Sequence, residues 1–141
     1  MGSYNVDVLE TLETTHISTG SLHRCSDGVV EIRFHKGMRI GIEEIEELLE
    51  AQLSMTPAMA SVLVDARNVV SMTREAQERT ADNPVNDRTA ATAILVGNPV
   101  SALLGNFFIR FGRPPYPARV FRKEEEARAW LLEHLAKHSN D

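Results

Sequence analysis

The 141-residue sequence predicts an α/β fold in which four helices cover a mostly parallel sheet of about five strands, with an antiparallel strand at one edge. The first observation is the apolar run Ala93–Val96, which is typical of a strand buried on both faces. It leads directly into a helix for which Asn98 is a suitable cap and Pro99 a suitable first residue. The second observation is that strand and helix patterns alternate from Val29 onward, and right-handed crossovers make such strands parallel.

The chain before this alternating pattern is less regular. Residues 1–14 are polar and predict a tail or a loosely docked strand, so we assign residues 15–141 to a single domain. The segment Ile17–Cys25 is rich in Ser, Thr and Gly, which predicts a weak strand at an edge. A turn at Ser26–Gly28 connects it to Val29–Phe34, and the resulting hairpin makes the two strands antiparallel neighbours.

The middle of the sequence predicts a helix, a strand and a second helix. Apolar side chains recur at helical spacing in Gly41–Leu53, with glutamates on the remaining surface. The short apolar run Ser61–Asp65 predicts a central strand. Thr73–Ala81 predicts a polar helix with Thr73 as its cap. Because this second helix has few apolar side chains to bury, we expect it to be the most mobile segment.

The last part of the sequence repeats the same pattern. The helix that starts at Pro99 ends near Gly112, a short strand follows at Ala118–Phe121, and a final helix covers about Lys123–Lys137. We expect the buried core to include Val62, Leu63, Val64, Ile94, Leu95, Val96, Phe107 and Trp130.

Composition limits the function classes. The net charge of −5 and the pI near 5.5 argue against nucleic-acid binding, which needs a basic surface. Cys25 is the single cysteine, which excludes an internal disulfide and fits a reducing compartment. No apolar run approaches the roughly 20 residues that span a bilayer, so we expect no stable membrane insertion and a cytoplasmic location.

No pattern of catalytic, metal or cofactor residues stands out. His23 and Cys25 could lie side by side on a strand, but they are more often ordinary strand residues than a nucleophilic pair. His134 and His138 are one helical turn apart, and no third metal ligand is evident. We therefore expect no catalytic residue, no metal and no cofactor.

Four segments resemble a known group of proteins: Ala91–Val96, Ser101–Phe108, Pro115–Phe121 and Glu125–Leu131. They are similar to uncharacterised bacterial proteins with a SpoIIAA-like fold, which anti-sigma-factor antagonist (STAS) domains and CRAL-TRIO lipid-transfer domains share. The resemblance covers about residues 15–136. It implies the α/β architecture described above and no established reaction.

The STAS resemblance also implies a regulatory loop. In STAS antagonists a serine in an Asp-Ser-Ser-Gly motif is phosphorylated after a strand that ends in Asp. Asp65 matches the strand-end aspartate, but the motif is absent, and only Ser71 and Thr73 supply hydroxyl groups in the following loop.

Candidate ligand or regulatory residues lie near the carboxyl end of the predicted central strand, where open α/β sheets form ligand crevices. Asp65 and Arg67 either form such a site or cap a turn and pair with other charges. Ser71 and Thr73 precede a helix N-terminus that favours a phosphate or a carboxylate, and Arg67, Arg74 and Arg79 could add hydrogen-bond donors. Asn106, inside an apolar block, either contacts a ligand or bonds to a neighbouring loop.

The helix after Pro99 is apolar on nearly all sides, which indicates that something covers it. We name Leu104, Phe108 and Phe111 as candidate interface residues and expect a homodimer or an apolar ligand there. Two functions follow. The first is a non-enzymatic regulatory or protein-interaction module that resembles STAS domains. The alternative is a carrier or sensor of a lipid-like or small anionic ligand, as in CRAL-TRIO domains, which a cavity beneath this helix would favour.

Overall fold

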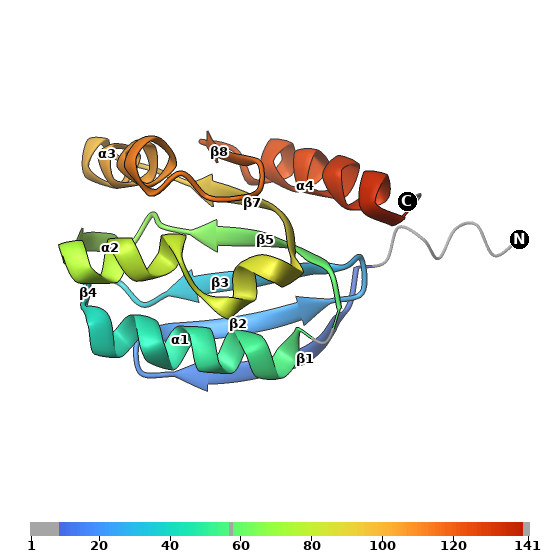
Figure 1. The fold of residues 1–141 in the computed structure, drawn as a ribbon, viewed down its shortest axis with the longest axis horizontal. Helices are drawn as coiled ribbons and strands as arrows, with labels where there is room; N and C mark the ends of the chain where they lie inside the picture. The colour runs from blue at the N-terminus through green and yellow to red at the C-terminus, as the bar shows by residue number, and fades with distance from the viewer. Residues whose placement is uncertain (1–8, 57, 140–141) are drawn as a thin grey trace, which may run out of the picture.

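The computed structural model describes residues 9–56 and 58–139, without the side chains of Val100, Phe107, Phe111 and Ser139. It confirms the α/β prediction. A six-stranded sheet has the order β1-β2-β3-β5-β7-β8, and β3, β5, β7 and β8 are parallel (Figure 1). Its strands are β1 (Thr11–Ile17), β2 (Gly20–Cys25), β3 (Val29–Phe34), β5 (Ala60–Asp65), β7 (Thr89–Leu95) and β8 (Ala118–Phe121).

The antiparallel edge contains one strand more than the sequence predicted. The expected strand Ile17–Cys25 is β2, and a turn at residues 18–19 connects it to β1, which begins at Thr11. Gly20 follows this turn because the backbones come very close there: a Cβ atom at this position would lie 1.9 Å from the Arg33 carbonyl oxygen. The polar, threonine-rich sequence of β1 suits an exposed edge strand, which is why it resembled a tail. Residues 1–8 lie outside the described part of the chain.

The parallel strands alternate their side chains between two covered faces. On one face, Leu63 packs with Leu131 of α4 (Glu124–Ser139), and the Ser61 hydroxyl donates to the Leu131 carbonyl at 2.9 Å. On the other face, Val62 and Val64 belong to the larger core beneath the remaining helices.

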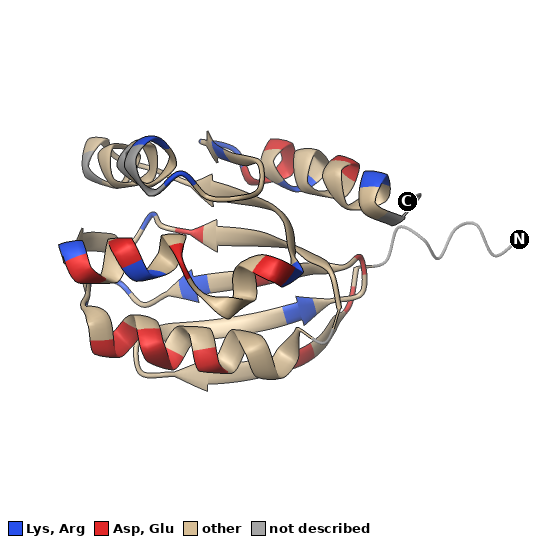
Figure 2. Ribbon diagram, in the orientation of Figure 1, with Lys and Arg blue, Asp and Glu red and all other residues tan. Residues whose placement is uncertain are grey.

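Three helices and two short helical segments cover this second face, and α1 and α2 lie in front of the strands in Figure 1. They are α1 (Ile42–Met55), α2 (Arg74–Ala81), the 3₁₀ segment η2 (Pro84–Arg88), α3 (Pro99–Phe107) and the π-helical segment η3 (Phe108–Gly112). Thr73 caps α2 and Asn98 caps α3, as predicted. Acidic residues recur along the exposed side of α1, a solvated surface (Figure 2).

A second, two-stranded parallel sheet, β4 (Met38–Ile40) and β6 (Val69–Met72), was not predicted. Its strands are too short to show a clear period in the sequence. β6 runs directly into the cap of α2, and the Thr73 amide donates to the Ile40 carbonyl at 2.9 Å. The small sheet therefore fixes the start of α2.

Most of the predicted core is confirmed. Val62, Leu63, Ile94, Leu95 and Val96 are buried. Val64 and Trp130 are only half-buried, and the Phe107 side chain is outside the described residues. Within the described residues, none of the helices is both long and apolar enough to cross a membrane.

Candidate functional site

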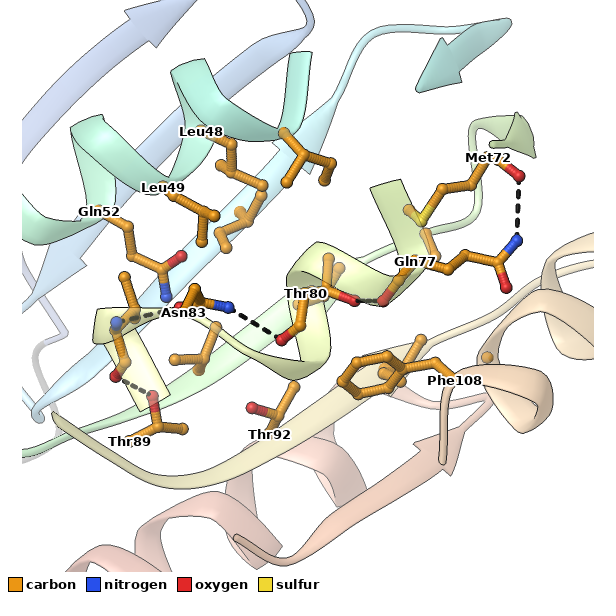
Figure 3. A pocket seen from close by; sticks show the side chains of 18 of the residues that line it. Leu48, Leu49, Gln52, Met72, Gln77, Thr80, Asn83, Thr89, Thr92 and Phe108 are labelled. Atoms are coloured by element: carbon orange, nitrogen blue, oxygen red, sulfur yellow. Dashed lines mark hydrogen bonds between the residues drawn. The ribbon is translucent and has the colours of Figure 1, made fainter. Parts of the chain in front are cut away.

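A pocket of about 130 Å³ lies between the sheet and the helices of the second face. Side chains of β3, β5 and β7 form its floor, and α1, α2 and η2 form walls around it (Figure 3). Leu104 and Gly105 of α3, Phe108 of η3 and Tyr116 before β8 complete the lining. The site depends on elements that are far apart in the sequence.

Most of the pocket lining is apolar. These residues are Ile32, Phe34, Ile45, Leu48, Leu49, Val62, Val64, Ala66, Val69, Met72, Val85, Ile94, Leu104 and Phe108. Val64 is on a central strand and is nevertheless only half-buried, since the pocket lies above it. A preformed apolar space of this kind is typical of small-molecule sites.

The polar lining residues are uncharged at neutral pH. They are Gln52, Gln77, Thr80, Asn83, Asn86, Thr89, Thr92 and Tyr116. Burial raises the pKa of Tyr116, and its hydrogen bond with Thr92 only partly opposes this, so the phenol stays protonated. Among the described lining residues there is no Asp, Glu, Lys, Arg, His or Cys. A charged ligand would therefore lose hydration here without gaining a counter-charge.

Several of these polar groups already have partners in the backbone. The Thr80 hydroxyl donates to the Gln77 carbonyl at 2.6 Å. The Asn83 amide donates to the carbonyls of Arg79 and Thr80, each at 2.9 Å. These bonds hold the connection between α2 and η2 in place and leave little capacity for a ligand.

Two glutamine side chains differ from the rest. Gln77 Nε2 donates to the Met72 carbonyl at 3.0 Å, whereas Gln77 Oε1 is buried and accepts no hydrogen bond from the described residues. Gln52 of α1 is 6% exposed, and its side chain makes no hydrogen bond within the described part of the chain. In Figure 3, Gln52 and Gln77 come from different helices, with Thr80 between them.

Asp65 and Arg67 do not reach this pocket, because Asp65 points to the α4 face of the sheet. Asp65 Oδ2 accepts hydrogen bonds from Arg67 Nη2 at 2.7 Å and from Arg33 Nη1 at 2.9 Å. Arg33 also pairs with Glu124 at the start of α4, at 2.8 Å. Burial alone would raise the pKa of Asp65, but the hydrogen bonds from Arg67 and Arg33 outweigh it and hold this pKa below its usual value. These contacts connect α4 to the sheet.

The hydroxyl groups of the predicted regulatory loop lie at the start of α2. Ser71 is half-buried on β6, and Thr73 is exposed, with its Oγ1 accepting a hydrogen bond from the Ala76 amide at 3.2 Å. The arginines expected to bind a phosphate have carboxylate partners: Arg67 with Asp65, Arg74 with Glu78, and Arg79 with Glu46. An anion at this loop would have to compete with these ion pairs.

The predicted residues of α3 and η3 separate into two groups. Asn106 is exposed and donates to the Ala102 carbonyl, one turn earlier, at 2.9 Å, so it is neither buried nor bonded to a loop as the sequence suggested. Leu104 and Phe108, expected at an interface, instead line the pocket. Leu103, also on α3, is an apolar side chain that is 71% exposed. The side chain of Phe111 lies outside the described residues.

The sequence neighbours His23 and Cys25 do not form a catalytic pair. The His23 ring contacts the hydroxyls of Thr14 at 3.0 Å and Ser21 at 2.9 Å. Cys25 is 3% exposed, and burial raises the pKa of its thiol. Within residues 9–56 and 58–139, no group of three or more His, Cys, Asp or Glu residues could hold a metal ion.

With this geometry established, comparison with known proteins places the chain in a family. The model of a domain of unknown function, DUF7793, matches residues 23–135. The chain belongs to the DUF7793 family. No curated protein matches this DUF7793 chain.

Solved structures support the fold of the DUF7793 chain. An uncharacterised protein of the DUF3478 family from Shewanella loihica PV-4, with a SpoIIAA-like fold, matches with a TM-score of 0.51. The identity is 12%, over 87% of this chain and 93% of that chain. A protein of unknown function from Arthrobacter sp. fb24 is 23% identical over 78% of this chain and 96% of that chain, but its TM-score of 0.29 carries no structural argument. The resemblance to an uncharacterised SpoIIAA-like family is thus confirmed.

Sequence reasoning missed the glutamines of the pocket. One signal was available, because Gln52 continues the apolar stripe of Ile45, Leu48 and Leu49 at helical spacing. A polar residue in a buried stripe indicates a specific partner. For Gln77, which lies on a polar helix, no pattern in the sequence indicated burial.

Proposed function

We propose that this protein binds a compact, mostly apolar small molecule in the pocket beneath α1, α2 and α3, as a non-enzymatic carrier or sensor. The observation that supports this proposal is the apolar cavity of about 130 Å³ on which the three helices converge. An apolar cavity of roughly 150 Å³ is known to stay free of water and to bind benzene. A ligand of similar size fits this volume better than a long acyl chain does.

The lining favours a neutral ligand over the small anionic ligand that the sequence left open. No cationic side chain is among the described lining residues. Burying an ionised group without a partner costs several kcal/mol or more. Arg67 and Arg79, which could have bound an anion elsewhere, have carboxylate partners.

A sensor role would connect the pocket to the regulatory module expected from the STAS resemblance. Met72, Gln77 and Thr80 line the pocket, and the exposed Thr73 lies between the first two. A ligand that contacts this wall would stabilise one arrangement of the surface around Ser71 and Thr73. Homodimer formation through α3 stays a separate prediction.

The proposal is tested by titrating benzene into the protein labelled with ¹³C at its Ile, Leu and Val methyl groups. We expect saturable shifts of the methyl signals of Val62, Val64, Ile94 and Leu104, which line the pocket, and no shifts for Val29 and Leu131 on the α4 face. Val64→Phe should fill the space and weaken binding. The control is Val70→Phe, the same exchange at an exposed position outside the pocket.

Two outcomes would contradict the proposal. One is the absence of saturable shifts up to the solubility limit of benzene. The other is equal benzene binding by the wild type and by Val64→Phe, which would locate binding elsewhere.

A further inference from the structure

The orientation of the Gln77 amide determines whether a ligand must donate or accept a hydrogen bond there. An amide side chain can in general be turned end for end, but here Nε2 donates to the Met72 carbonyl at 3.0 Å. A turned amide would place two acceptors, Gln77 Oε1 and the Met72 carbonyl oxygen, against each other. The atom of the Gln77 amide that has no hydrogen bond is therefore Oε1, which is an acceptor.

This acceptor lacks a partner. Gln77 Oε1 has less than 1 Å² of accessible surface and receives no hydrogen bond from the described residues, although Gln77 is among the residues that line the pocket; a ligand donor would reach this atom with a turn of the Gln77 side chain. Buried polar atoms are nearly always hydrogen-bonded, so such an atom calls for a partner that is not part of the chain. An acceptor can be satisfied only by a donor, such as a hydroxyl or an N–H group.

Gln52 provides an independent sign that the pocket is built for a polar group. Its side chain is more than nine-tenths buried, lines the same pocket, and has no hydrogen-bond partner among the described residues. It belongs to the apolar stripe of α1, where a leucine would bury more favourably. Two unpaired polar side-chain ends in a mostly apolar space favour a ligand that is apolar with a polar end over a pure hydrocarbon of the same size.

We infer that the ligand is a compact neutral molecule with a hydroxyl or N–H group that donates a hydrogen bond to Gln77 Oε1. This inference rests on the proposed function and adds the chemical class of the ligand. The apolar body of the molecule would contact the floor of β5 and β7, and its donor would point toward α2. Carboxylates and phosphates are excluded from this class, because they offer acceptors and a charge.

Three aromatic probes test the inference: phenol, which can donate; anisole, which is one methyl group larger and can only accept; and benzene, which can do neither. The dissociation constants come from the same methyl-shift titration at pH 7, where phenol is neutral. Satisfying one buried acceptor should make phenol bind about tenfold more tightly than benzene. Anisole should gain no such advantage.

Gln77→Met removes the acceptor at similar size, and the advantage of phenol over benzene should fall to about twofold or less. Glu75→Met is the control, because it places the same side chain on the same helix at an exposed position outside the pocket and should keep that advantage. Equal binding of phenol, anisole and benzene by the wild type would overturn the inference and leave the proposed function intact. An advantage kept in Gln77→Met would also overturn it. The comparison of probes on the wild type needs no variant to fold.

Discussion

Replacing Val64 with leucine should stabilise the protein, which is unusual for an added methylene in a core. The pocket is about 130 Å³ in volume and its lining is mostly apolar, so an added apolar group has room to be buried there. Val64 lines this space from the central strand β5 and is only half-buried. One additional buried methylene should contribute about 0.8 kcal/mol of stability. The same substitution should weaken benzene binding, since it takes up ligand volume.

The measurement is urea unfolding followed by far-UV circular dichroism, with the free energy of unfolding extrapolated to water and the m-value compared. Val29→Leu is the matched control, because Val29 is fully buried on the α4 face and does not line the pocket. There the extra methylene has no space and should cost about 1–3 kcal/mol. If both variants lose stability to the same extent, the pocket is not available space and the reasoning is refuted.

Three further predictions concern the framework of the fold. Hydrogen bonds from arginines lower the pKa of Asp65 in the folded state. The ionised carboxylate therefore stabilises the fold above the unfolded-state pKa of about 4, and this contribution is lost as the pH falls from there through the lower folded-state pKa. Asp65→Asn should lower the free energy of unfolding at pH 7 and make it depend less on pH in the acid range. Amides of residues 72–81 should exchange hydrogen faster than those of residues 62–65, and equal strong protection would show that α2 is not a mobile wall. Gly20→Ala should cost about 1–3 kcal/mol, more than Gly97→Ala, because its new methyl group would meet backbone instead of a flexible side chain; thermal unfolding that ranks them in the opposite order would contradict this.

The strands and helices that the sequence revealed are those with a strong local pattern. Ser61–Asp65 and Ala93–Val96 could be recognised because a strand buried on both faces is a continuous apolar run. β1 was less clear, because an exposed edge strand has no apolar face, and residues 1–14 fitted either a tail or a loosely docked strand. β1 is recognisable as a strand through its pairing with β2, and the composition of β1 alone does not predict that pairing.

The predicted site residues Asp65 and Arg67 lie at the carboxyl end of β5, but on the α4 face of the sheet and not in the pocket. The rule about carboxyl ends of strands directed attention to Asp65, but alternation along β5 points this side chain to α4, where Arg33 and Arg67 neutralise it. The next residue, Ala66, lines the pocket on the opposite face. The sequence alone did not show which face of the sheet is covered by α2, the helix beneath which the pocket lies.

The cavity has its origin in the composition of α2. This helix has few apolar side chains, a composition that predicts a mobile segment; in the structure Ala76 is its buried residue. α3 cannot close the gap by moving inward, because a Cβ atom at Gly105 would already lie 3.1 Å from Val120 and 3.2 Å from Ile94. α1 and α3 therefore rest on the sheet while α2, held at its start by the short β4–β6 sheet, spans the space between them without large side chains to fill it. The same polar helix supplies Gln77, so the element that leaves the pocket empty also provides the group that would recognise its ligand.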